Sequence, residues 1–115
     1  MNTAQFLDRL EKEPTKIQFS DTMELIDSNY DFTPCKFTNG TQLNEANQNN
    51  GSCKLLAFAK LHNLSTEQTL QCFGDYYRID VLQRPENNDH QNIRNLILNG
   101  LDGVKFHGQP LVKKI

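Results

Sequence analysis

The segment Asn49 to Lys54, Asn-Asn-Gly-Ser-Cys-Lys, holds residue types that could do covalent chemistry. Ser52 is a favourable N-cap for the apolar stretch that follows, which places Cys53 in the first turn of a helix. The free N–H groups and the positive dipole end of a helix start stabilise an anion, and Lys54 adds to that effect. Cys53 is therefore a candidate low-pKa nucleophile. The same helix start, with Asn49 and Ser52, could instead hold a carboxylate or phosphate, and a small buried cysteine is the structural alternative.

A second polar segment, residues 89–95, opens the last predicted helix and offers a base and an anion ligand. Asp89 is an ordinary N-cap. His90 in the first turn could act as general base for Cys53, which would make a cysteine-dependent hydrolase or transferase. Arg94 lies one turn further along the same face, where its guanidinium could bind an anion through two hydrogen bonds. Chain order alone does not show that His90 and Cys53 are close, and a purely structural cap is the alternative.

Two adjacent tyrosines in residues 75–78 supply aromatic side chains for a binding surface. Neighbouring residues on a helix point about 100° apart, so both phenols cannot face the core. One is expected in the core and the other on a surface or cleft. The candidate ligand-binding residues are Asn49, Ser52, Tyr77 and Arg94, with ordinary core packing as the alternative for the tyrosine.

Six predicted helices must position these side chains. Apolar residues recur at helical spacing, Ser65 and Gln68 form a capping box, and Pro14, Gly74 and Gly100 end helices. Thr3 and Ser20 are the predicted caps of the first two helices. The predicted ranges are 3–13, 20–29, 52–62, 65–73, 75–83 and 90–99, and the most apolar helix, 52–62, is expected at the centre.

Three short strands are expected at 31–37, 41–44 and 104–107. The Asn39-Gly40 pair is a strong hairpin signal between the first two, while Pro34 restricts the first to a sheet edge because proline has no N–H. A turn and a loose tail complete the chain. Helices and strands do not alternate as in a βαβ fold, so residues 1–115 are predicted to form one helix-rich α+β domain with a three-stranded antiparallel sheet.

The composition excludes several classes of function. Fourteen acidic and twelve basic residues give the 115-residue chain a net charge of −2, with no basic cluster for nucleic acid. The longest apolar run, 55–59, is far shorter than the ~20 residues of a membrane span, so no membrane partner is expected. Thirteen asparagines and nine glutamines are interpreted mainly as solvated loop.

Cysteine usage and the absence of known motifs bear on the compartment and on cofactors. Three cysteines without a Cys-x-x-Cys pair fit neither a disulfide framework nor a zinc site. No phosphate-loop, dinucleotide or metalloprotease motif occurs, so neither a cofactor nor a metal is expected. There is no secretory signal peptide. We expect a cytoplasmic protein with reduced thiols.

Five segments, taken together, are specific: Tyr-Asp-Phe-Thr-Pro at 30–34, Asn-Asn-Gly-Ser-Cys-Lys at 49–54, Phe-Gly-Asp-Tyr-Tyr-Arg at 73–78, Asp-His-Gln-Asn-Ile-Arg-Asn at 89–95 and Phe-His-Gly-Gln-Pro-Leu at 106–111. In this order, over about residues 6–111, the chain resembles the HopJ type III effector protein family. The resemblance implies a small α+β domain with no established activity and no agreed catalytic residues. Asn47 stands where the family has glycine, which asparagine can replace in left-handed backbone, and Cys35 stands where no thiol is expected.

The family name implies export through a type III system, whose signals are typically unstructured N-terminal segments. A capped amphipathic helix is predicted to begin by about residue 4 of this chain. We therefore expect a cytoplasmic protein, with export through a type III system as the alternative.

Three functions remain open from the sequence. The first is a non-enzymatic binding module for a small anionic or amide-bearing ligand, or for a peptide, whose pocket combines Asn49, Ser52, Tyr77, His90 and Arg94. The second is the enzyme that uses Cys53 and His90, and the third is a protein-interaction domain whose polar motifs only cap helices. The first two require that the helices beginning near Ser52 and Asp89 start side by side and open on a common hollow.

Overall fold

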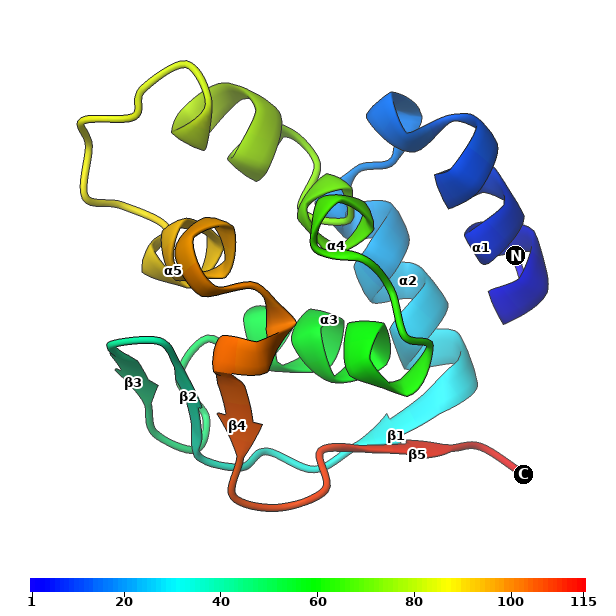
Figure 1. Cartoon of the computed structure of the whole chain (residues 1–115). Coiled ribbons are helices and arrows are strands. Elements are labelled where there is room, and N and C mark those ends of the chain that lie inside the picture. Colours follow the sequence, from blue (N-terminus) through cyan, green and yellow to red (C-terminus); the bar gives the residue numbers. More distant parts are fainter.

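The computed structural model covers residues 1–115 and contains the predicted helices, with ends shifted by a few residues (Figure 1). The α+β class is confirmed. No helix is long and apolar enough to cross a membrane. The helices are α1 (Thr3–Lys12), α2 (Phe19–Asn29), α3 (Asn50–Leu61), α4 (Thr66–Gln71), the π-helix η2 (Tyr76–Val81) and α5 (Gln91–Asn99), with short 3-10 turns η1 (Pro14–Lys16) and η3 (Leu101–Gly103).

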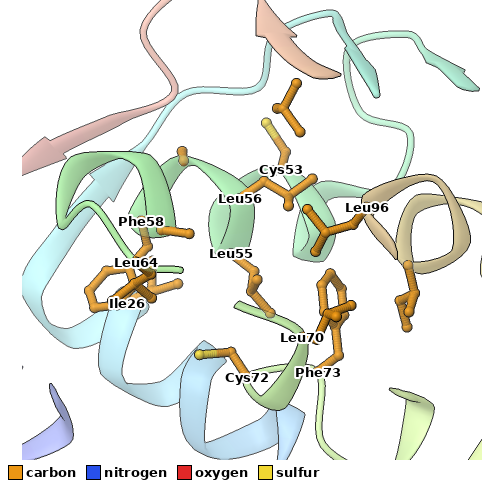
Figure 2. Close-up of a cluster of buried hydrophobic side chains, with 14 of the residues drawn as sticks. Ile26, Cys53, Leu55, Leu56, Phe58, Leu64, Leu70, Cys72, Phe73 and Leu96 are labelled. Atoms are coloured by element: carbon orange, nitrogen blue, oxygen red, sulfur yellow. The ribbon is translucent and has the colours of Figure 1, made fainter. Parts of the chain in front are cut away.

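α3 lies at the centre of the molecule, as its apolar sequence predicts (Figure 1). Leu56, Phe58 and Ala59 have no exposed surface, and they belong to one core cluster of 23 buried residues. Because apolar side chains cover most of its circumference, α3 can be surrounded by other elements without leaving polar groups unsolvated. Figure 2 shows side chains of this helix among those contributed by α2, α4 and α5, namely Ile26, Leu70 and Leu96.

The predicted three-stranded antiparallel sheet is present, and a second, two-stranded antiparallel sheet accompanies it. The two-stranded sheet pairs β1 (Tyr30–Phe32) with β5 (Leu111–Lys113), which forms where a loose tail is predicted. The other has the order β3-β2-β4, with β2 (Phe37–Asn39), β3 (Gln42–Asn44) and β4 (Val104–Phe106). The predicted strand 31–37 is divided because residues 33–36, which include Pro34, leave the first sheet before β2 enters the second. The Asn39-Gly40 hairpin is confirmed, with Gly40 at φ 58°.

Helix starts are capped differently from the prediction in four of the six helices. Asn2, not Thr3, caps α1 in a capping box with Gln5, and α2 begins after Gln18 rather than Ser20. α3 and α5 begin after Asn49 and His90, at φ 54° and 50°, instead of after Ser52 and Asp89. Neither of these left-handed residues caps its helix with its side chain. The predicted Ser65–Gln68 capping box is confirmed, and Asn47 has the left-handed backbone (φ 72°) that its departure from the family pattern requires.

The π-helix η2 is anchored at its start by close contact with the start of α2. Gly74, at φ 63°, ends the α4 segment, and a Cβ there would lie 2.7 Å from the backbone nitrogen of Phe19. The guanidinium of Arg78 donates to the backbone oxygens of Pro14 and Ile17, which ties η2 to the segment that precedes α2. These contacts bring Tyr76, the first residue of η2, against Phe19, with 5.4 Å between ring centroids.

Candidate functional site

A pocket of about 240 Å³ opens at the starts of α3 and α5. Asn49 and Ser52 line it from α3, and His90 lines it from α5. The two helix starts therefore open on a common hollow, which is the arrangement that two of the three functional hypotheses require. Gln42 of β3 completes the polar side of the pocket.

Buried asparagines fasten these two helix starts together. The side chain of Asn44, at the end of β3, is fully buried, and its Oδ1 accepts from Nδ2 of Asn49 at 2.7 Å and from Nδ2 of Asn92 at 2.9 Å. Asn92 Oδ1 in turn accepts from Nδ2 of Asn44 at 3.1 Å and of Asn39 at 3.2 Å. A carboxamide carries both donors and acceptors, so these groups can satisfy one another away from water. The exception is Oδ1 of Asn39, which is buried and has no hydrogen-bond partner. The interpretation of the asparagines as solvated loop is wrong for this cluster.

Both helix starts leave N–H groups without acceptors. The first hydrogen bond of α3 runs from Cys53 N to Asn49 O at 3.0 Å, and that of α5 runs from Ile93 N to His90 O at 2.9 Å. Neither N-cap side chain accepts a hydrogen bond from its helix, so the backbone N–H groups that precede Cys53 and Ile93 have no acceptor. The positive ends of the two helix dipoles lie at the same place. The unpaired N–H groups are those of Asn50, Gly51, Ser52, Gln91 and Asn92.

Aromatic rings form the opposite wall of the pocket. Phe19 stacks on Phe73, with 6.1 Å between centroids and 13° between planes, and Tyr76 meets Phe19 edge to face. Gly51 lets α3 approach this wall, since a Cβ at that position would lie 2.6 Å from Cζ of Phe19. A ligand in the pocket would therefore contact polar groups on one side and aromatic faces on the other.

His90 is held at the edge of this pocket by two neighbours. Its Nε2 lies 3.0 Å from Oδ2 of Asp80, and its ring lies 5.2 Å from the ring of Tyr76. Asp89 is more distant, at 3.9 Å from Nε2. The imidazole is thus oriented by a carboxylate and an aromatic ring, neither of which is adjacent to it in sequence.

Arg94 and Tyr77, two of the predicted ligand-binding residues, do not line the pocket. The guanidinium of Arg94 forms an ion pair with Asp89 at 2.6 Å and donates to the backbone oxygens of residues 84, 85 and 89, so it fastens the loop before α5. The same contact lowers the pKa of Asp89 below its usual value. Tyr77 is buried in the core, and burial raises its pKa. The expected division between the two tyrosines is confirmed, but Tyr76 is the one that faces the pocket.

Cys53 lies in the core, outside the pocket that His90 lines. Only 1% of its surface is exposed, and burial raises the pKa of its thiol, with a smaller contribution from the neighbouring Cys35. Lys54, which the sequence predicts beside the thiolate, instead pairs with Asp27 at 2.8 Å. Figure 2 shows Cys53 among apolar side chains of the core. Of the two alternatives for Cys53, the structure therefore matches the small buried cysteine and not the low-pKa thiolate, because packing removes the thiol from water more strongly than the helix start stabilises its charge.

Alkylation of the folded protein is expected to spare Cys53. Iodoacetamide at pH 8 should modify only Cys35, which is half-buried, because Cys53 and Cys72 are buried and burial raises the pKa of Cys72 to about 12. Mass spectrometry of tryptic peptides measures this, with protein in denaturant as the control in which all three thiols react. Rapid modification of Cys53 in the folded protein would restore the nucleophile hypothesis.

Several residues of the pocket are not among the predicted ligand-binding residues. Tyr76 and Asn92 lie within the motif segments 73–78 and 89–95, whereas Phe19 and Gln42 carry no local signal at all. They reach the pocket only through the packing of α2 and the β2–β3 hairpin. No group of three or more histidine, cysteine or acidic side chains is arranged to hold a metal ion.

Comparison with known proteins bears on identity and fold. A search of curated proteins finds no match. A solved structure, "Crystal structure of unknown function protein VPA0580", is 55% identical with a TM-score of 0.97, and the alignment covers 99% of this chain and 95% of that one. The model of the family described as HopJ type III effector protein matches residues 3–111. That match spans nearly the whole chain and confirms the resemblance seen in its motifs: the chain belongs to the HopJ type III effector protein family.

Proposed function

We propose that this protein is a non-enzymatic binding module for a small molecule that carries a carboxylate next to an apolar body. The proposal rests on one observation: a pocket of about 240 Å³ has a polar wall, formed by two helix starts, and an aromatic wall opposite it. Unpaired N–H groups of two helix starts suit carboxylate oxygens. The rings of Phe19, Phe73 and Tyr76 suit an apolar body.

The charges around the pocket favour an anion over a cation. No carboxylate lines the pocket. The acidic groups beside His90 are already engaged, Asp80 with His90 itself and Asp89 with Arg94. The partial positive charges of the two helix starts are therefore not neutralised by any lining group.

A titration with hexanoate and with benzoate, followed by amide NMR, tests the proposal. The amide signals of Gly51, Ser52 and Gln91 are expected to shift in a saturable way at millimolar ligand, because these N–H groups lack acceptors in the free protein. Tyr76→Ala is expected to weaken binding about tenfold by removing one ring of the apolar wall.

Ile79→Ala is the matched control for this variant. Ile79 lies on the same π-helix and is 42% exposed, against 46% for Tyr76, but it does not line the pocket. Its substitution should leave binding unchanged. Absence of saturable shifts with both carboxylates, or equal weakening by the two variants, would contradict the proposal.

The three cysteines are all free, which suits a reducing compartment. We infer that the protein acts in the cytoplasm, and the free thiols support this inference. A type III export route remains the alternative that the family name suggests.

A further inference from the structure

A second hollow, of about 360 Å³, adjoins the pocket across its aromatic wall. Phe19, Phe73 and Tyr76 line both cavities, so the two share these aromatic side chains. The remaining lining comes from the start of α2, through Gln18 and Ser20, and from Asp75, the residue before η2. The two hollows therefore share one set of aromatic side chains and differ in the rest of their lining.

The two hollows differ in charge. Asp75 is exposed at the second hollow, and its carboxylate has no ion pair and accepts no hydrogen bond from any side chain or backbone group. No lysine or arginine lines either cavity. The first pocket thus presents uncapped helix starts and no carboxylate, whereas the second presents an unpaired carboxylate beside aromatic faces.

We propose that the ligand is a zwitterion, with its carboxylate at the helix starts and an ammonium group at Asp75, joined by an apolar spacer that crosses the rings. The inference rests on the proposed function, because it extends the same carboxylate site. Asp75 supplies the opposite charge, and the faces of Phe19 and Tyr76 attract a cation that lies over them. An ω-amino acid, or the end of a peptide with an amine-bearing side chain, has this chemistry.

Three probes of matched length test the inference: 6-aminohexanoate, hexanoate and hexylamine. They carry both charged groups, the carboxylate alone and the ammonium alone. 6-Aminohexanoate is expected to bind about tenfold more tightly than hexanoate, measured by the same amide NMR titration. Its amine should also shift the signals of Ser20 and Tyr76, which hexanoate should leave less affected.

Asp75→Asn is expected to remove this advantage by reducing the affinity for 6-aminohexanoate to that for hexanoate, whose own binding should not weaken. Asp102→Asn, at an exposed carboxylate outside both cavities, is the charge-matched control. If hexanoate binds and 6-aminohexanoate binds no more tightly, the zwitterion inference is overturned while the proposed function stands. If hexylamine binds as tightly as 6-aminohexanoate, the inference is likewise overturned. If neither hexanoate nor 6-aminohexanoate binds, the proposed function fails as well.

Discussion

Asn44→Ala is expected to lower the free energy of unfolding by about 3 kcal/mol, as measured by urea denaturation followed by circular dichroism. The side chain of Asn44 is fully buried and makes three hydrogen bonds of 3.1 Å or less, to Asn49 and Asn92. Its removal leaves Nδ2 of the buried Asn92 without its acceptor and takes one donor from Oδ1 of the same residue. An unpaired buried group costs about 1–3 kcal/mol. The loss should also separate the starts of α3 and α5, so carboxylate binding is expected to weaken in the same variant.

Two further variants show whether the effect comes from the amide network. Asn87→Ala, at an exposed asparagine whose side chain makes no hydrogen bond, should change stability by less than about 0.5 kcal/mol. In a double-mutant cycle, Asn92→Ala should be much less destabilising once Asn44 has been replaced, because the two residues share their hydrogen bonds. Additive effects of the two substitutions would show that the asparagines act independently and that the network does not couple the helix starts.

Gly74→Ala is expected to destabilise the protein by about 3 kcal/mol or more, from two separate causes. The residue has φ 63°, a conformation that costs a residue with a Cβ roughly 1–2 kcal/mol. The added Cβ would also lie 2.7 Å from Phe19 N and 2.8 Å from Gln18 Cα, which are backbone atoms that cannot rotate away. The strain falls at the junction that positions Phe19 and Tyr76, so the melting temperature and the affinity for hexanoate should fall together.

Gly74→Asn separates the two causes. Asparagine tolerates left-handed backbone better than alanine, but it carries the same Cβ. If the close approach to α2 dominates, Gly74→Asn remains strongly destabilising. If Gly74→Asn is instead nearly as stable as the unmodified protein, the close contact with Gln18 and Phe19 is not the cause. The destabilisation by Gly74→Ala would then come from backbone conformation alone.

The elements of this fold are largely predictable because their signals are local. The apolar spacing of residues 52–62 and the Ser65–Gln68 box act within a few residues of one another. The same is true of the turn at Asn39-Gly40. Such interactions operate in much the same way wherever the segment lies in the molecule, so a reading of the chain recovers them.

The side chains of the site follow a different rule, as Asn44 and Cys53 show. Asn44 belongs to a polar segment that is expected to be solvated, yet it is buried and joins two helices. Cys53 has two possible roles by its sequence, and packing into the core decides for the buried one. Arg94 is a candidate anion ligand by its type and spacing, but in the structure its guanidinium pairs with Asp89 and donates to the backbone of the preceding loop. In each case the environment of the side chain comes from residues on another element, or from the loop before α5 in its folded conformation.

By itself, the sequence determined the α+β class, the six helical segments, the hairpin and the polar segments 49–54 and 89–95 at two helix starts. The tertiary structure decided that these two starts meet at one pocket. Only the tertiary structure decided that β5 pairs with β1, that Tyr76 rather than Tyr77 faces the pocket, and that a buried amide network holds its polar side. The physical reason is range. Periodicity, caps and turns depend on neighbours along the chain, whereas burial, ion pairing and the pKa of a thiol depend on what the completed fold places around each group.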